Sequence, residues 1–285
     1  MEKELYQNHV HISSKHRLLD LKLKEVWQYR ELIGLFVGRN FSVSYKQTIL
    51  GPVWIFVSPL ITSLIYVILF GNIARLGTDG IPMLLFYLSG NAIWTYFSSC
   101  VSNNASTFTG NANLFGKVYF PRLTVPIANM FMALTSFGLK MILVLLLLAY
   151  YLARGAVKVH FLTWLALPFV LLWLGIMGMS IGIIVSSITT KYRDLAMLVS
   201  YGIQLWMYVT PVVYPLSTVS HMKIIRMITM VNPVTMPIEI FRYCLLGSGT
   251  ILPVYSIYSM VLTLVLAFVG IIIFNKVERT FMDTV

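Results

Sequence analysis

Few residues of this chain have the chemistry of a catalytic centre, and they lie far apart. Asp79, Asp194 and Glu239 fall in separate predicted loops, and the five histidines lie towards the ends of the chain or in loops. A hydrolytic site needs a nucleophile, a base and an orienting group within hydrogen-bond reach of one another. The spacing predicts no such set, so the chain is not expected to be an enzyme.

One loop invites a nucleotide-binding interpretation but lacks the pattern. Five residues separate Gly110 from Gly116-Lys117, where a phosphate loop has four, and Val118 stands where Ser or Thr is required. The chain is therefore not expected to bind ATP. The loop instead combines polar and aromatic side chains suited to docking another protein. These are Asn111, Asn113, Phe115, Lys117, Tyr119, Phe120 and Arg122.

The composition shows what must position these residues. The chain is 58% hydrophobic and only 11% charged, with a mean hydropathy of +0.81, whereas a soluble domain has roughly a quarter of its residues charged. Lipid must therefore cover most of its surface. The net charge of +11 favours cytoplasmic loops rich in Lys and Arg over a nucleic-acid partner. Cys100 and Cys244 have no metal or redox spacing and are expected to pack in the interior.

Segments of about 20 apolar residues are needed to cross a bilayer as helices, and six are predicted. They are Leu50–Phe70, Met83–Val101, Val125–Leu152, Phe161–Ile188, Leu195–Val213 and Val254–Phe274. The first 20 residues are polar, so no cleaved signal peptide is expected. Cations are concentrated before the first span, after the second and fourth, and in the tail, which places both termini in the cytoplasm.

Two further segments are expected to lie along or partly within the membrane. Lys24 to Arg39 gathers apolar side chains on one helical face, which is typical of an interfacial helix. A helix packed on a partner protein is the alternative, and the two are compatible. Residues 214–252 contain two short apolar stretches, separated at Asn232-Pro233. They favour two re-entrant helices over an ordinary outer loop.

The predicted spans contain no Asp, Glu or His, which disfavours a proton-driven transporter. Lys140 is the one ionisable exception, and it either faces a cavity or snorkels to the surface. Aromatic residues are abundant in spans one, two and five. Their rings could stack on sugar faces while their polar tips bond hydroxyls, with the interfacial aromatic belt or internal packing as the alternative for each ring.

An ordered series of motifs resembles one family. It comprises Arg39 with Tyr45-Lys46-Gln47-Thr48-Ile49-Leu50-Gly51, Trp54, Pro59, Lys117-Val118-Tyr119-Phe120-Pro121-Arg122 with Pro126, Tyr192-Arg193-Asp194-Leu195, Thr210-Pro211-Val212-Val213-Tyr214, Asn232-Pro233, Arg242 and Phe274-Asn275-Lys276-Val277-Glu278-Arg279-Thr280-Phe281. From about Leu23 to Val285 the chain is similar to membrane subunits of ABC-2-type polysaccharide exporters, which export O-antigens, capsules and teichoic acids.

The resemblance implies an all-α fold: six spans, an N-terminal interface helix and two outer re-entrant helices between spans five and six. It divides the chain into a polar lead (1–22), the interface helix (23–49), the six-span domain (50–274) and a cytoplasmic tail (275–285). Within the six-span domain lie a coupling loop (109–122) and the outer re-entrant segment (214–252). It further implies a homodimer in the bacterial plasma membrane with two copies of a separate ATPase, which binds the ATP and Mg²⁺. This chain would then bind no cofactor of its own.

The resemblance also implies three sets of site residues. ATPase coupling would use Phe115, Lys117, Tyr119, Phe120 and Arg122; the interface helix and gate would use Arg30, Arg39, Tyr45, Lys46 and Gln47; the channel would be lined by Trp54, Tyr66, Trp94, Tyr201, Trp206 and Tyr208. Cations such as Arg39 could gather the pyrophosphate of a lipid-linked glycan, or they could simply mark topology. Export of a small hydrophobic compound or lipid, and a stand-alone channel or scaffold, remain the alternatives.

Overall fold

Every regular element in the part of the chain that the structure describes is helical. A computed structural model describes residues 23–45, 51–190 and 194–284. The elements are α1 (Leu23–Gln28), α2 (Arg30–Tyr45), η1 (Gly51–Val53), α3 (Trp54–Tyr66), the π-helical η2 (Val67–Ile73), α4 (Met83–Ala105), α5 (Thr107–Gly110), α6 (Ala112–Phe115), α7 (Thr124–Ala153), η3 (Phe161–Ala166), α8 (Leu167–Thr189), α9 (Leu195–Val209), α10 (Lys223–Val231), α11 (Thr235–Leu246) and α12 (Pro253–Thr284). The predicted all-α class is confirmed.

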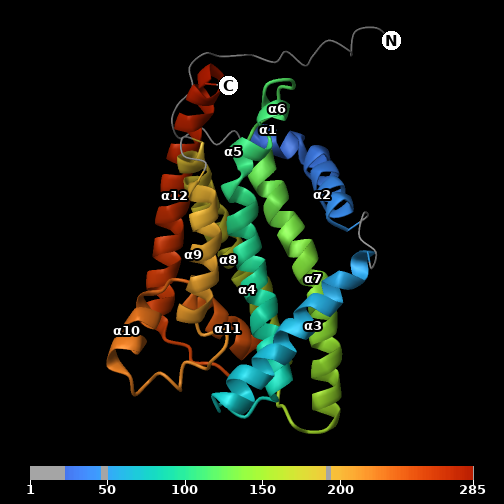
Figure 1. The fold of residues 1–285 in the computed structure, drawn as a ribbon, viewed down its shortest axis with the longest axis vertical. Helices are drawn as coiled ribbons and strands as arrows, with labels where there is room; N and C mark the ends of the chain where they lie inside the picture. The colour runs from blue at the N-terminus through green and yellow to red at the C-terminus, as the bar shows by residue number, and fades with distance from the viewer. Residues whose placement is uncertain (1–22, 46–50, 191–193, 285) are drawn as a thin grey trace.

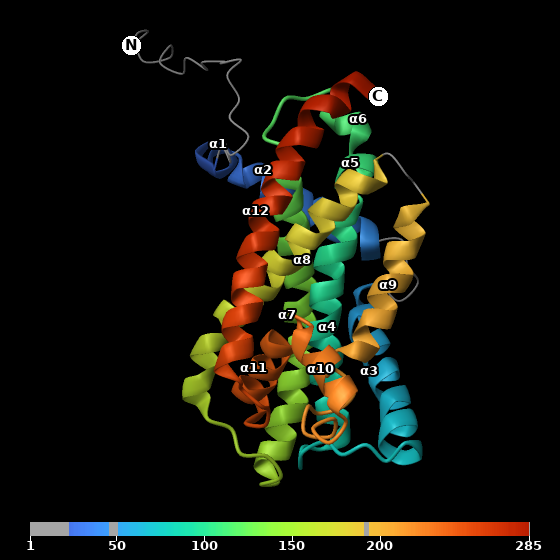
Figure 2. The same cartoon turned by 90° about the vertical axis from the view of Figure 1, so that its left-hand side faces the viewer.

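The long helices run beside one another along one axis, and the short elements gather at its two ends. α1, α2, α5, α6 and the C-terminal end of α12 share one end, while α10 and α11 lie towards the other (Figure 1, Figure 2). α3 crosses α4 obliquely and reaches α7. The coupling loop, the interface helix and the last helix therefore lie at the same end, as the charge distribution predicted.

Four of the six predicted spans are long and apolar enough to cross a bilayer. They are Trp54–Ile73, Thr124–Ala153, Phe161–Thr189 and Pro253–Val277. Among the described helices, α4 and α9 do not meet both criteria, and α9 has only 15 residues. The pair α10 and α11 would count as a fifth span if taken together, but the two helices are bent by 89°. The expected break at Asn232-Pro233 is confirmed.

α4 is less apolar than the other long helices, and other parts of the protein surround it. Most of its residues are buried, and it packs against α3, α7, α8, α9 and α11. A helix of 23 residues is about 35 Å long, enough to cross the hydrocarbon core. Its shielded position tolerates polar side chains such as Asn91 and Asn104, which lower the hydropathy of the sequence without meeting lipid.

Small residues let α8 approach α4 closely. A Cβ atom at Gly178 would lie 2.7 Å from Cys100 Cβ, and one at Gly182 would lie 2.6 Å from the carbonyl oxygen of Val101. Membrane helices commonly use such small residues, because packing contacts rather than a hydrophobic effect hold them together. Cys100 is unpaired and buried in this contact, and Cys244 is likewise unpaired and buried, as expected for packing residues.

The close contact predicts a loss of stability in Gly178→Ala. The added methyl group would also lie 3.1 Å from the carbonyl oxygen of Phe97, and overpacking of this kind costs about 1–3 kcal/mol. Gly138→Ala in α7 is the matched control, because a Cβ added there would meet no atom within 4 Å and the change gains up to about 1 kcal/mol of helix propensity. Thermal unfolding in detergent measures both; equal midpoints for the two variants would contradict the close contact.

Candidate functional site

A group of buried phenylalanines connects the coupling loop to the rest of the bundle. We call Phe36, Phe108, Phe115, Phe120 and Phe274 the phenylalanine cluster; each is at most 8% exposed. Ring centroids are 5.9 Å apart for Phe36 and Phe120, 5.7 Å for Phe115 and Phe120, and 5.1 Å for Phe108 and Phe274. These are favourable distances for tilted and edge-on aromatic pairs. α2, α5, α6 and α12 therefore share one packed contact.

The predicted coupling residues divide into an inner and an outer set. Phe115 and Phe120 point inward into the cluster, and Arg122 is half-buried with its guanidinium 5.5 Å from the Phe115 ring. Lys117 is exposed, and Tyr119 is 68% exposed. Only the outer set can contact a partner protein directly. The inner set can instead carry a displacement of the loop into the bundle.

Local hydrogen bonds hold the loop in this shape. The Asn111 side-chain amide donates to the Thr107 carbonyl oxygen at 3.0 Å, which joins α5 to the start of α6. The Phe108 backbone N–H donates to Ser186 Oγ of α8 at 3.2 Å. α6 ends at Phe115, and the N–H of the next residue, Gly116, donates to the Ala112 carbonyl oxygen. The loop is thus fixed to α8 as well as to the phenylalanine cluster.

The apolar face predicted for the interface helix packs on the chain itself. Val26 and Phe36 are buried, and Tyr29, Ile33 and Val37 are half-buried against the phenylalanine cluster or the elements around it. α2 also packs along α7. The predicted face is therefore present, and it packs on the coupling loop and α7.

The predicted gate residues are only partly within the described structure. Arg30 is exposed, with its guanidinium 6.0 Å from the Trp27 ring. Arg39 is exposed and lies 5.4 Å over the Phe36 ring. Tyr45 is the last residue of α2, and Lys46 and Gln47 lie outside the described residues. Arg39 is the member of this set that the structure places at a cavity.

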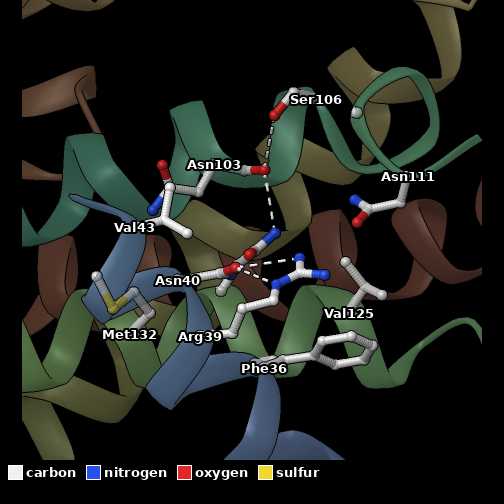
Figure 3. A pocket seen from close by; sticks show the side chains of 12 residues that line it. Phe36, Arg39, Asn40, Val43, Asn103, Ser106, Asn111, Val125 and Met132 are labelled. Carbon is white, nitrogen blue, oxygen red and sulfur yellow. Dashed lines mark hydrogen bonds between the residues drawn. The ribbon is translucent and has the colours of Figure 1, made fainter. Parts of the chain in front are cut away.

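That cavity, which we call the amide pocket, lies between α2, the ends of α4 and α7, and α5. It has a volume of about 310 Å³ and is lined by Arg39, Asn40, Asn103, Ser106, Asn111 and Asn129 among others. Figure 3 shows Arg39 hydrogen-bonded to Asn40. The Asn129 side-chain amide donates to the backbone carbonyl oxygen of Asn103 at 3.1 Å. A guanidinium among amides and a hydroxyl can bind a phosphate or sugar hydroxyls.

Two larger polar cavities lie along α4. The first, the α4–α9 groove, has a volume of about 620 Å³ and includes Thr62, Asn91, Ser98, Ser102, Ser200 and Gln204. The second, the Lys140 cavity, has a volume of about 370 Å³ between α3, α4 and α7. Both are lined by Thr62, Asn91 and Thr95. They therefore adjoin, and hydroxyls, amides and one ammonium group line them together with apolar side chains such as Ile203, Leu205 and Met207.

Five of the six predicted channel aromatics line these two cavities. Tyr66, Trp94, Tyr201 and Tyr208 border the α4–α9 groove, and Trp54 borders the Lys140 cavity. Tyr201 and Tyr208 are 66% and 51% exposed, which leaves their rings available to a ligand, whereas Trp94 is only 4% exposed. The sixth aromatic, Trp206, lies elsewhere.

Trp206 makes its contacts within the chain itself. It borders an apolar cavity between α8 and α9, and its indole N–H donates to Asn232 Oδ1 at 3.0 Å. Asn232 also donates through Nδ2 to Thr210 Oγ1 at 2.8 Å and accepts the Val234 N–H. Trp206 therefore ties α9 to the break between α10 and α11, and it does not border either polar cavity.

α11 contains a buried ion pair that the sequence analysis did not include among the predicted site residues. Glu239 and Arg242 are 1% and 2% exposed and bonded to each other. Arg242 also donates to the Pro211 carbonyl oxygen at 2.7 Å and lies 4.2 Å over the Phe86 ring, while Glu239 accepts the Thr250 N–H at 2.9 Å. Their spacing of three residues in an apolar helix, which brings two side chains to one face, was the available signal.

The fold and comparisons with known proteins together define the class. Four long apolar helices, together with the buried helix α4, make this a multi-pass membrane protein. Residues 31–246 match the family described as ABC-2 type transporter, and the chain belongs to that family.

Relatives with assigned names are similar over most of this chain. An O-antigen export system permease protein, RfbA, of Myxococcus xanthus is 30% identical over 74% of this chain and 78% of its own length. A protein of the same name from Klebsiella pneumoniae is 28% identical over 93% of this chain and 99% of its own length. Another from Klebsiella pneumoniae is 28% identical over 89% and 94%.

The buried ion pair predicts an asymmetric response to substitution. Arg242→Met should lower the thermal unfolding midpoint strongly, because breaking a buried pair leaves an uncompensated charge at a cost of about 3–5 kcal/mol. The double variant Arg242→Met with Glu239→Gln removes both charges and should regain part of that loss. Thermal unfolding of the two variants in detergent checks this. A double variant less stable than Arg242→Met alone would contradict the coupling.

Proposed function

We propose that this chain is the membrane-spanning permease subunit of an ATP-driven exporter that moves a lipid-linked cell-surface polysaccharide outwards. O-antigen is the form of this substrate that the names of the relatives favour; capsule and teichoic acid belong to the same chemical class. The observation that carries the proposal is the pair of adjoining polar cavities bordered by Trp and Tyr rings, within a family of transporters. The chain itself binds no cofactor.

The lining of the cavities favours a sugar polymer over a small hydrophobic compound. Thr62, Ser98 and Gln204 offer hydroxyl and amide groups to sugar hydroxyls. The exposed rings of Tyr201 and Tyr208 offer flat apolar surfaces for sugar faces. A polymer that slides needs many such weak contacts of similar strength, and polar groups spaced along a lining that also holds apolar side chains can supply them.

The working unit in this proposal is a homodimer with two copies of an ATPase, which holds the ATP and Mg²⁺. The faces of α3 and α9 support a second copy, because Ile61 and Leu64 of α3 and Leu198 and Leu205 of α9 are 48–67% exposed. Two such faces would enclose the α4–α9 groove of each copy. The unit lies in the bacterial inner membrane, with six spans per subunit, α10 and α11 re-entrant, and both termini cytoplasmic.

ATP hydrolysis would act on this subunit through the coupling loop. A partner that contacts Lys117 and Tyr119 moves the loop, and the phenylalanine cluster passes that motion to α2 and α12. α2 ends at Tyr45, and the next long helix in the sequence is α3, whose Trp54 and Tyr66 border the cavities. The chemical step belongs to the partner, and this chain changes shape.

The amide pocket is suited to the lipid carrier of the glycan. It lies at the end of the bundle that carries the coupling loop, and its Arg39 guanidinium can pair with a pyrophosphate while Asn103 and Asn111 meet the first sugar. The same pocket adjoins α2, so binding there and motion of the interface helix are physically linked.

Docking of the ATPase at the coupling loop predicts that reversing a charge in this loop weakens ATPase binding. Lys117→Glu combined with Tyr119→Ala should reduce recovery of the co-expressed ATPase about tenfold or more, as expected for loss of an aromatic and a charged contact at an interface. Lys223→Glu is the control, because Lys223 is also exposed but lies in α10 towards the opposite end. Affinity purification followed by quantitative blotting measures the ratio; unchanged recovery in the double variant would contradict docking at this loop.

Export is tested in cells that lack the gene. Deletion should remove surface polysaccharide and leave lipid-linked polymer inside the cell, and the wild-type chain should restore export. Tyr201→Ala with Tyr208→Ala should restore it poorly, since stacking on an aromatic ring contributes roughly 0.5–1.5 kcal/mol per contact. Tyr255→Ala in α12 is the control, because Tyr255 borders neither polar cavity.

The alternatives give different outcomes in the same strains. Normal surface polysaccharide after deletion, with no polymer inside the cell, would reject polysaccharide export and leave a small hydrophobic substrate. A purified chain that is monomeric and transports without an ATPase would identify a stand-alone channel. Full restoration by the double tyrosine variant would contradict the role assigned to the groove aromatics.

A further inference from the structure

Lys140 is a cation at membrane depth that lines a cavity. It lies in α7, and its Nζ donates to Thr95 Oγ1 of α4 at 2.8 Å. The Thr95 hydroxyl in turn donates to the Ala92 carbonyl oxygen at 3.0 Å. An ammonium group has three donors, and Thr95 accepts one. The Lys140 cavity, with Trp54 and Asn91 in its lining, is the space into which a second partner fits.

Among the residues that the structure describes, no carboxylate is placed to neutralise Lys140. The chain has ten acidic residues. Five precede α3 in the sequence, Asp79 and Asp194 lie outside the long helices, and Glu278 and Asp283 are at the C-terminal end of α12. Glu239 alone is within an apolar helical segment, and it already pairs with Arg242. The described residues of a second copy of the same chain would offer the same set of carboxylates.

Lys140 lies near the middle of α7. It is 16 residues from the first residue of α7 and 13 from the last, which places it about 24 Å and about 20 Å along the axis from the two ends. A headgroup lies about 15 Å from the midplane of the hydrocarbon core. A molecule that enters the cavities can therefore bring a counter-charge closer to Lys140 than a headgroup at the bilayer surface can.

We propose that the Lys140 cavity binds an anionic group of the transported molecule, a carboxylate or phosphate carried by the sugar chain. This rests on the proposed function, and it adds that the substrate is an acidic polymer. An isolated cation in a polar cavity away from bulk water attracts an anion more strongly than it would in water. Asn91 and Thr95 supply hydrogen-bonding groups beside it.

The test compares charged and neutral oligosaccharides of equal length on the intact exporter with its ATPase in nanodiscs. Wild-type complex should bind tetragalacturonate about tenfold more tightly than maltotetraose, a difference of about 1.4 kcal/mol. Lys140→Met should remove that preference, and Lys140→Arg should retain it. Lys158→Met is the control, because Lys158 is exposed and outside both cavities. Calorimetry gives the affinities, and thermal unfolding shows that each variant is folded.

The outcomes separate this inference from the proposed function. Equal affinity for the two oligosaccharides in the wild type, or a preference that survives in Lys140→Met, overturns the anion site and leaves glycan export standing. Binding of inorganic pyrophosphate that needs Lys140, with no preference between the oligosaccharides, assigns the site to the lipid carrier and overturns the acidic-polymer inference. A Lys140-dependent preference in a chain whose deletion leaves surface polysaccharide unchanged supports the site and overturns polysaccharide export.

Discussion

In the proposed mechanism, the working of this subunit depends on the close packing of the phenylalanine cluster. Phe36, Phe108, Phe115, Phe120 and Phe274 come from segments far apart in the sequence and meet at one end of the bundle. Protein interiors are packed too densely to deform smoothly, so a displaced coupling loop must carry α2 and α12 with it or break the contact. A surface that only docked a partner would not need buried rings on its inner side.

The bundle combines a buried frame, formed by α4, α8 and α11, with two helices that are less tightly packed, α3 and α9. α4 and α8 are held together by glycine contacts, and Arg242 fixes α11 to the loop at Pro211 and to α4. By contrast, few residues of α3 and α9 are buried. Motions cost least where buried apolar contacts are few. Within one subunit, α3 and α9 are therefore held less tightly than the frame.

Sequence patterns predict the strongly apolar spans, the break at Asn232-Pro233 and the apolar face of α2 correctly, because burial and lipid exposure leave a direct periodic signal. They could not show that α4 is shielded by protein, since a polar membrane helix looks the same whether it faces a channel or a neighbour. They grouped Trp206 with the channel aromatics, because the sequence alone does not show how α9 is rotated and therefore which way its side chains point. The Glu239–Arg242 pair escaped notice because its surroundings come from distant segments. The cavity at Lys140 was one of two stated possibilities, and only the neighbouring helices could decide between them.

The separation between frame and cavity lining bears on how such a protein can change over generations. Thr62, Ser98, Ser200 and Gln204 border the α4–α9 groove and are not members of the apolar core. Ser200 and Gln204 are exposed, and substitutions at exposed positions usually alter stability by less than about 0.5 kcal/mol. The lining can therefore accumulate changes, and the pattern of charge and rings offered to a polymer can shift, while the helices that fold the protein stay intact. One architecture could in this way follow a surface polysaccharide whose structure is under pressure to diversify.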